Sequence, residues 1–393
     1  MKSSNGENLI FIISQPRAGS TLLQLMLSGH PDIATTSEPW IALHPVFSLM
    51  KEGIDTVYNS KLARLALIDF LKQSGVDESF YKRQVTSFLL SLYNRSIAHQ
   101  KKKIFLDKTP RYYHIINELI EIFPNAKFII IFRNPLAVLN SILTSWVKND
   151  ILRLSGNRDD LMIAPQKMID FIKCYPDKSY HVKYEDLVMQ PESVLKEICS
   201  YLGIPYSNQM LDYGKRRNSE WKFGDAFGVH NASRPTLNSL DKWKKGFTTP
   251  QERLIAISYL RALGPELIKK MGYNYSEIES SIDVPSEKVE GNLISWATIM
   301  SDIGGFSKTK EVRNVVHRIL SDGRPWNQNQ GTSDITGEDD ELREMVNLVA
   351  KKFMDSRTEE LKKERDWMLN TLSWRLTMPL RMIGKYLKFY KNT

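Results

Sequence analysis

The sequence predicts an α/β fold, a three-layer sandwich in which a central parallel sheet has helices on both faces. Four apolar runs, at residues 9–13, 103–107, 127–132 and 179–184, are each followed by a stretch with helical apolar spacing. The run at 127–132 is almost continuously apolar, which is typical of a strand buried on both faces of a parallel sheet. Strands that alternate with helices along the chain predict this open-sheet architecture.

Length and composition limit the classes of protein that the chain can belong to. Its 393 residues can form one large domain or two, and the 42% hydrophobic content is sufficient for a core. The net charge of +9 suits an anionic ligand, a membrane surface or nucleic acid, and does not choose among them. Cys174 and Cys199, the two cysteines, form no CxxC motif and exclude a disulfide framework. We therefore expect a reducing, cytoplasmic location, with no signal peptide and no spanning helix.

A short loop after the first apolar run has the features of an anion site. The segment Gln15-Pro16-Arg17-Ala18-Gly19-Ser20-Thr21-Leu22-Leu23 joins the predicted strand to a predicted helix. Backbone N–H groups at such a helix N-terminus favour a phosphate, and glycine lets the backbone approach it closely. The GxxxxGK[ST] pattern of nucleotide triphosphatases is missing from this loop, and Arg17 supplies the cation. The alternative is a helix cap after a buried strand.

Polar residues also stand where the later strands end, the edge at which parallel sheets place their ligands. Glu38 lies at the end of a short strand that begins at Ile33 and ends in a loop at Pro39. Lys108 follows the second run, and Arg133 follows the third. Ser141 lies about two helical turns beyond Arg133, and Tyr184 ends the fourth run. Arg133 and Ser141 suit a second phosphate. Each residue also has a plain structural interpretation, as a solvated loop residue, a carboxylate partner or a packed side chain.

These motifs together resemble those of the PAPS-dependent sulfotransferases, most closely their tyrosylprotein-sulfotransferase-like bacterial branch. The resemblance covers roughly residues 8–275, and its motifs are Pro16 to Leu22, Arg133-Asn134-Pro135 with Ser141, Tyr184 to Leu187, and Leu202-Gly203-Ile204-Pro205. It implies a P-loop-like sandwich and an enzyme that moves a sulfuryl group from PAPS to an acceptor hydroxyl. The donor would be bound without a metal ion, leaving 3′,5′-ADP.

The resemblance also implies a role for each residue. Glu38 would be the general base, and Arg17 and Lys108 would neutralise charge on the leaving phosphate. The residues that would bind the nucleotide are Arg17, Ala18, Gly19, Ser20, Thr21, Leu22, Arg133, Ser141 and Tyr184. Trp40 and Ser145 stand where the tyrosylprotein enzymes have arginines, so the sequence differs from that branch on the acceptor side. Alternatives are a P-loop-type small-molecule kinase, sulfation of protein tyrosine, and a noncatalytic scaffold.

The chain beyond the resemblance predicts a separate extension. We expect a sulfotransferase domain at 1–276, a linker with a small helical element at 277–340, and a charged helix with a basic tail at 341–393. From Trp374 onward there are five basic residues and no acidic ones, beside an apolar face, as in helices that contact membranes peripherally. The alternative is a helix docked on the protein itself.

The predicted acceptor is inferred from the same tail. Its Ser-Trp-Arg-Leu-Thr-x-Pro-Leu-Arg run, at 373–381, resembles tails of bacterial surface-polysaccharide enzymes, which implies a glycan or glycolipid acceptor at the inner face of the membrane. The charged helix at 341–372 leaves homo-oligomerisation open. The basic residues are scattered and have no stacking platform between them, so we expect no nucleic-acid partner.

Overall fold

The architecture comes from a computed structural model, which describes residues 6–51, 58–148, 151–212, 214, 234, 237–282 and 296. The described residues belong to one compact unit, Met1–Ser301 with Ser307–Trp326. The second unit, Asp302–Phe306 with Asn327–Thr393, lies outside them. The predicted charged helix, the basic tail and most of the predicted linker therefore lie outside the described residues as well.

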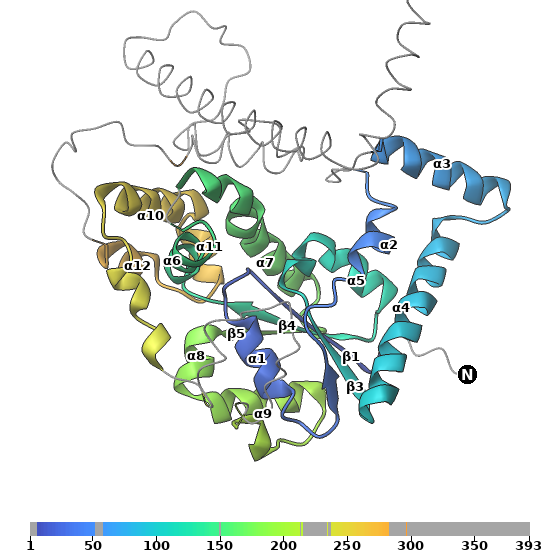
Figure 1. Cartoon of the computed structure of the whole chain (residues 1–393), viewed down its shortest axis with the longest axis horizontal. Helices are drawn as coiled ribbons and strands as arrows, with labels where there is room; N and C mark the ends of the chain where they lie inside the picture. The colour runs from blue at the N-terminus through green and yellow to red at the C-terminus, as the bar shows by residue number, and fades with distance from the viewer. Residues whose placement is uncertain are drawn as a thin grey trace, which may run out of the picture. The chain divides into compact units, whose positions relative to one another are not determined.

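The centre of the unit is a five-stranded parallel sheet with the strand order β2-β3-β1-β4-β5 (Figure 1). The strands are β1 (Leu9–Ser14), β2 (Ile33–Thr35), β3 (Ile104–Lys108), β4 (Lys127–Phe132) and β5 (Ser179–Lys183). In β1, Ile10 pairs with Leu106 of β3 on one side and with Lys127 of β4 on the other. The predicted parallel sheet is thus confirmed, and the carboxyl ends of three adjacent strands meet beside the phosphate loop.

Helices cover both faces of the sheet, because successive side chains of a strand point to opposite sides. Ile10 and Ile12 of β1 join one buried cluster, whereas Leu9 and Phe11 join the other. The first cluster contains residues of α1 (Ser20–Leu27), α6 (Pro135–Ser145), α8 (Tyr184–Met189), α9 (Pro191–Leu202) and α10 (Pro250–Leu263). The second contains residues of α4 (Glu78–Gln100), the 3₁₀ helix η1 (Pro110–Ile115), α5 (Ile116–Ile122) and α7 (Ala164–Cys174).

A helical insert lies between β2 and β3, and the residues that it buries do not simply follow its apolar spacing. It consists of α2 (Leu43–Phe47), α3 (Ser60–Gln73) and α4. On α4 the buried row is Val85, Leu89, Tyr93 and Ile97, an i, i+4 spacing, so that Phe88 and Leu92 point outward. On α3 only Leu71 is buried, while Leu62 and Leu65 are about 60% exposed, because the helix packs through one end only.

The last part of the described chain returns to the first face of the sheet. After the short helices η4 (Asn208–Met210), η6 (Leu237–Ser239) and η7 (Lys242–Lys245), the chain forms α10, α11 (Pro265–Lys270) and α12 (Tyr275–Ser280). Helix α12 crosses residue 276, where the sequence places a domain boundary, so helical structure continues to Ser280. None of the helices within the described ranges is both long and apolar enough to cross a bilayer.

Candidate active site

The phosphate loop connects β1 to α1 and has an unusual backbone. Arg17 has a φ of 68° and Gly19, the N-cap of α1, has a φ of 97°. A Cβ atom at residue 19 would lie 2.2 Å from Cδ2 of Tyr184, so the residue has to be glycine on both counts. Ser20 and Thr21 then begin the helix and are almost completely buried. The sequence prediction of a strand, a tight loop and a helix N-terminus is confirmed.

Arg17 connects this loop to α6. Its Nε donates a hydrogen bond of 3.0 Å to Oγ of Ser141, across 124 residues of chain. Its guanidinium carbon also lies 6.0 Å from the ring centroid of Trp146, the residue that follows α6. The predicted 5′-phosphate loop and the predicted 3′-phosphate serine are therefore direct neighbours.

Arg133 approaches the same loop from the end of β4. It donates from Nη1 to the Arg17 carbonyl at 3.0 Å and from Nη2 to the Ser239 carbonyl at 3.1 Å. Its guanidinium carbon lies 4.3 Å from the ring centroid of Tyr184, whose hydroxyl is 2.6 Å from Oγ of Ser239. Nε of Arg133 is buried and has no acceptor in the part of the chain that the structure describes. An N–H of a buried guanidinium is thus left for an anion.

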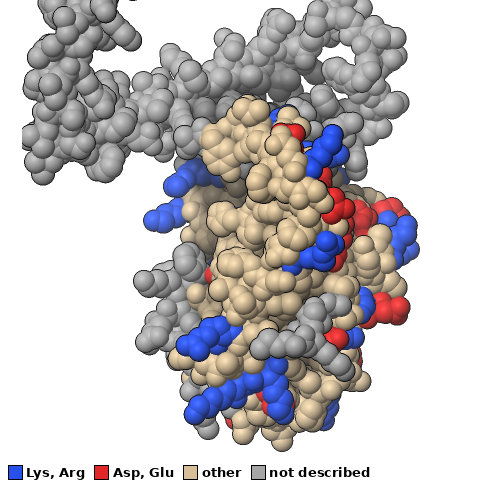
Figure 2. Space-filling model, turned by 90° about the vertical axis from the view of Figure 1, so that its right-hand side faces the viewer, with Lys and Arg blue, Asp and Glu red and all other residues tan. Residues whose placement is uncertain are grey.

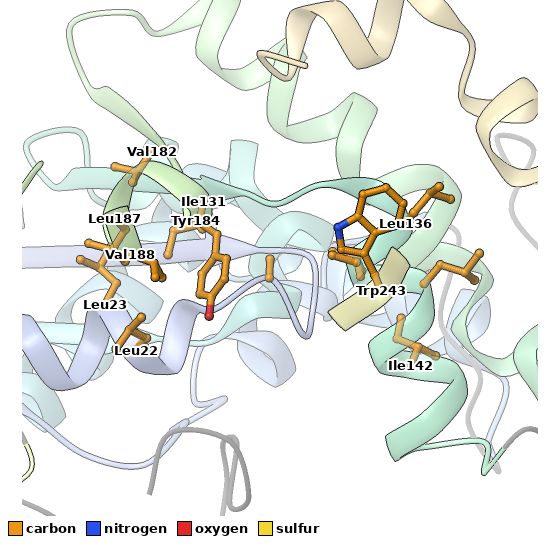
Figure 3. Close-up of a cluster of buried hydrophobic side chains, with 14 of the residues drawn as sticks. Leu22, Leu23, Ile131, Leu136, Ile142, Val182, Tyr184, Leu187, Val188 and Trp243 are labelled. Atoms are coloured by element: carbon orange, nitrogen blue, oxygen red, sulfur yellow. The ribbon is translucent and has the colours of Figure 1, made fainter. Parts of the chain in front are cut away.

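Tyr184 is the first residue of α8 and not the last of β5 as the sequence suggested. Only 8% of the residue is exposed, and its ring packs against Gly19 and Arg133. Figure 3 shows Tyr184 and Leu187 of α8 close to Leu22 and Leu23 of α1, within the first buried cluster. The contacts of the ring fix the shape of the loop.

The backbone at the tip of β4 is fixed by a carboxylate. Glu185 accepts a hydrogen bond from the backbone N–H of Asn134 at 3.0 Å and another from the Tyr273 hydroxyl at 2.6 Å. Asn134 in turn caps α6 through its side-chain oxygen, as expected for an Asn followed by Pro135 at the first helical position. Burial, with Glu185 nearby, raises the pKa of the Tyr273 hydroxyl well above its usual value. These bonds hold Arg133, the preceding residue, in place.

Glu38 and Lys108 form an ion pair beside the start of α1. Nζ of Lys108 lies 2.6 Å from Oε1 of Glu38 and donates to Oγ1 of Thr21 at 3.2 Å. The Lys108 side chain is fully buried and that of Glu38 is 13% exposed. The carboxylate lines a pocket, while the ammonium lies behind it. The three predicted catalytic residues, which come from separate parts of the chain, therefore lie around one phosphate loop.

A buried carboxylate lies next to Lys108 in β3. Asp107 accepts hydrogen bonds from the hydroxyls of Tyr93 at 2.7 Å, Thr109 at 2.8 Å and Tyr112 at 3.3 Å. Burial raises the pKa of Asp107 to about 6, although the three hydroxyls lower it. The Tyr112 hydroxyl also accepts from the backbone N–H of Ala42 at 3.1 Å, which ties η1 to the segment after Glu38.

The pocket in front of these groups has a volume of about 150 Å³. Its lining contains five of the predicted site residues, together with residues that the sequence analysis did not assign to the site: Pro16, Arg17, Gly19, Ser20, Thr21, Glu38, Trp40, Pro110, Arg111 and Trp146. The loop supplies anion-binding groups, the carboxylate can accept a proton, and the indoles form apolar walls. The pocket can therefore hold an anionic donor group beside a hydroxyl that loses its proton.

Arg111 is the clearest residue that sequence reasoning missed. Its Nε and Nη2 bind the two oxygens of Asp160 at 2.9 and 2.6 Å, a bidentate pair, and its guanidinium carbon lies 5.5 Å from the ring centroid of Trp146. Asp160 is buried in a π-helical turn, Asp159–Ile163, and also accepts from the Tyr113 hydroxyl at 2.7 Å. The signal available was the position of Arg111 immediately after Lys108-Thr109-Pro110.

Charged side chains of both signs are dispersed over part of the surface. On the face that Figure 2 shows, Lys and Arg side chains form separate groups, and Asp and Glu lie between some of them. In the described ranges, no three His, Cys, Asp or Glu residues come together as a group that could hold a metal ion.

Comparisons with known proteins find chains that are similar to this one. The protein-tyrosine sulfotransferase A of Caenorhabditis elegans is 24% identical over 322 residues, which cover 75% of this chain and 78% of that protein. The nodulation protein NoeE of Sinorhizobium fredii is 24% identical over 294 residues, covering 68% of this chain and 66% of NoeE. The sulfotransferase domain of the Synechococcus olefin synthase has a TM-score of 0.44 and 22% identity, over 70% of this chain and 98% of that domain.

The match to a family model is the decisive comparison. The model of the sulfotransferase family matches residues 9–208, from the first residue of β1 to the first residue of η4. That span covers about half of the chain and contains every predicted site residue, from Arg17 to Tyr184. Family membership favours sulfuryl transfer over the kinase alternative. The chain therefore belongs to the sulfotransferase family and is an enzyme of that class.

Proposed function

We propose that this sulfotransferase moves a sulfuryl group from PAPS to a hydroxyl of a glycan or glycolipid. The observation that carries the donor assignment is the junction of the phosphate loop with Arg133 and Ser141. Arg17 is bonded to both, through its carbonyl and its Nε. A donor with two separated phosphates matches two anion sites that share one arginine. The buried, unpartnered Nε of Arg133 supports the fit of a further phosphate oxygen at this place.

The residues of the chain would act on the donor mainly through position and charge. The loop amides with Ser20 and Thr21 would hold the phosphosulfate end, since a helix N-terminus favours anions. Arg17 and Lys108 would offset the charge that grows on the leaving oxygen in a loose, in-line transfer. Lys108 is well placed for this because its Nζ already contacts Thr21.

Glu38 would take the proton of the acceptor hydroxyl. Its carboxylate lines the pocket, and each of its oxygens still has a lone pair beyond the hydrogen bonds it accepts. The pairing with Lys108 holds the carboxylate at the wall of the pocket. A correctly placed general base typically contributes about 10²- to 10⁴-fold to the rate.

The walls of the pocket support a glycan acceptor. Trp40 and Trp146 both line it, and Trp146 is 39% exposed. Indole faces offer flat apolar surface with a polar edge, which suits the C–H face and hydroxyl rim of a sugar ring. Protein tyrosine is the second candidate acceptor, because several relatives are named protein-tyrosine sulfotransferases. The sequence itself departs from that branch at Trp40.

Two assays test the proposal. Labelled sulfate from PAPS is offered to glycans, glycolipids and tyrosine peptides, and we expect transfer to a glycan or glycolipid hydroxyl. Transfer to the tyrosine peptides alone would replace this acceptor with the second candidate. In calorimetry, 3′,5′-ADP should bind at least tenfold more tightly than 5′-ADP, since a charge-assisted bond is worth about 1.5–3 kcal/mol. Equal affinities would overturn the donor assignment.

Arg133→Gln sharpens the second assay. The variant should lose most of the preference for 3′,5′-ADP, because Nε of Arg133 is a buried guanidinium N–H with no acceptor among the described residues. Arg95→Gln, which changes an exposed arginine of α4, is the matched control and should retain the full preference. The peripheral membrane contact of the tail and self-association through the charged helix stay predictions, since both segments lie outside the described residues.

A further inference from the structure

The Glu38 carboxylate is held from two sides. Nζ of Lys108 contacts Oε1 at 2.6 Å, and the indole Nε1–H of Trp40 donates to Oε2 at 3.1 Å. The ammonium comes from the buried end of β3, whereas the indole comes from the same loop as Glu38, two residues later. Each oxygen therefore has its own donor, which fixes both the position and the rotation of the carboxylate plane.

The backbone of this loop is shaped so that the indole can return to the carboxylate. Pro39 restricts the preceding residue, Glu38, to an extended conformation. Trp40 has a φ of 56°, in the left-handed region that bulky residues rarely adopt. Its carbonyl accepts from the backbone N–H of Leu43 at 3.3 Å, and the next turn is held by Tyr112 through Ala42. Such a conformation costs about 1–3 kcal/mol and persists only where the surroundings enforce it.

We propose that Trp40 is a positioning residue, whose indole N–H fixes the orientation of the Glu38 carboxylate for proton transfer. This inference rests on the proposed function, in which Glu38 is the general base. The indole ring also forms part of the pocket wall, so one side chain supports both the base and the acceptor. The strained backbone at Trp40 is then explained by the hydrogen bond that it allows.

The charged groups around Glu38 determine where the carboxylate turns when this bond is removed. Lys108 and Asp107 lie in β3, Arg111 lies in η1, and Arg17 lies in the phosphate loop. Lys108 is fully buried and keeps its bond to Oε1. Without the indole N–H, Oε2 would be free to turn toward Arg111 or Arg17, away from the acceptor. The ionised carboxylate would also lose one of the hydrogen bonds that stabilise it.

The variant that tests the inference is Trp40→Phe, which keeps an aromatic wall but has no N–H. Sulfuryl transfer is measured against pH with labelled PAPS and the glycan that gives the highest turnover in the acceptor panel. We expect kcat to fall about tenfold, the effect of losing roughly 1.4 kcal/mol of stabilisation. We also expect the acidic limb of the kcat/KM profile to move to higher pH, while the affinity for 3′,5′-ADP changes less than twofold.

Three further variants separate positioning from a structural effect. Trp146→Phe makes the same change on the other indole of the pocket wall; it should change the KM for the acceptor but should not move the acidic limb of the profile. Trp40→His keeps a ring N–H and should recover part of the lost kcat. If Trp40→Phe does not fold, Trp40→Gly carries the same test, because glycine adopts a positive φ without strain.

These measurements distinguish a failure of the proposed function from a failure of the proposed role of Trp40. A wild-type protein that transfers no sulfate from PAPS would overturn the function itself. An active wild type with an unchanged pH profile and kcat in Trp40→Phe would overturn only the role of Trp40. If kcat of Trp40→His is no higher than kcat of Trp40→Phe, the ring N–H does not determine the rate, and the inference is overturned.

Discussion

The hydrogen bond from Nε of Arg17 to Oγ of Ser141 joins the phosphate loop to α6, two segments that are 124 residues apart. Both residues are expected to contact the nucleotide, but at different phosphates. The Ser141 hydroxyl accepts from Arg17 and can donate its own hydrogen to a phosphate oxygen, so it would contact both at once. The two ends of the nucleotide site are therefore coupled through one side chain, and a change at one end should be detectable at the other.

Ser141→Ala should reduce the affinity for 3′,5′-ADP more than it reduces the affinity for 5′-ADP. The loss expected is about fivefold to tenfold, since one hydrogen bond contributes about 1 kcal/mol net and somewhat more to a charged acceptor. Calorimetric titration of both nucleotides measures the difference. Thr144→Ala removes an exposed hydroxyl of the same helix, bonded to the Asn140 carbonyl, and should leave both affinities unchanged. Equal losses for the two nucleotides in Ser141→Ala would contradict a 3′-phosphate contact.

Glu38→Gln should reduce kcat by about 10²- to 10⁴-fold, because the amide cannot accept the proton of the acceptor. The amide oxygen can still accept from Lys108, so the affinity for 3′,5′-ADP should be kept, whereas the loss of the counter-charge should lower the stability of the fold. Single-turnover transfer from labelled PAPS measures the rate, and calorimetry measures the affinity. A variant with more than half of the wild-type rate would remove Glu38 from the mechanism.

Gly19→Ala should destabilise the protein more than Gly203→Ala does. Both glycines have a positive φ, of 97° and 72°, which costs an alanine about 1–2 kcal/mol. At Gly203 a Cβ would have no atom within 4 Å, whereas at Gly19 it would clash with the Tyr184 ring. Urea unfolding compares the free energies of unfolding of the two variants. Similar losses of stability would show that the Tyr184 ring can move away from the added Cβ atom. Affinity for 3′,5′-ADP should fall in Gly19→Ala only.

Asp107 should make the protein less stable as the pH rises. The pKa of its carboxyl is about 6 in the folded protein, above the ordinary value of 3.8, because of burial. The folded state therefore holds the proton more tightly than the unfolded state, and this contribution to stability is lost as the pH rises from about 4 to about 6. The Asp107→Asn variant has no carboxyl group at this position, so this contribution to the pH dependence of stability is absent from it.

The measurement for Asp107 is urea unfolding of both proteins at a series of pH values. The free energy of unfolding of the wild type, minus that of Asp107→Asn, should fall across the range from about pH 4 to about pH 6. The subtraction removes the titration of the other carboxylates. A difference that rises with pH would mean that the three hydroxyls outweigh burial at this carboxylate.

Much of the fold could be predicted because it depends on local patterns. The continuous apolar run at 127–132 could only be a strand buried on both faces, and it is β4. Gly19 and the polar residues after it marked the turn into α1. Residues at strand ends could be grouped into one site because parallel strands end at the same edge. Arg17, Glu38, Lys108 and Arg133 were predicted to lie together by that argument, and Ser141 was added through its helical spacing from Arg133.

The contacts that the sequence could not reveal depend on the three-dimensional arrangement. Asp160 belongs to a π-helical turn, yet it fixes Arg111 at the pocket. The pattern on α3 indicated a buried face, but whether a face is buried depends on what packs against it, and Leu62 and Leu65 are exposed. Trp40 was noticed as a departure from a family pattern, and its bond to Glu38 depends on a backbone angle that no residue pattern specifies.

The complete burial of Lys108 limits how this enzyme can change by mutation. An ammonium group with no exposed surface needs a counter-charge, and an uncompensated one costs about 3–5 kcal/mol, a large part of the stability of a typical domain. A chain that replaced Glu38 with an apolar residue would lose its base and much of its stability in one step. Variants of this chain that lack the proposed base should therefore be rare unless both positions change together, because the loss of Glu38 alone would also destabilise the fold.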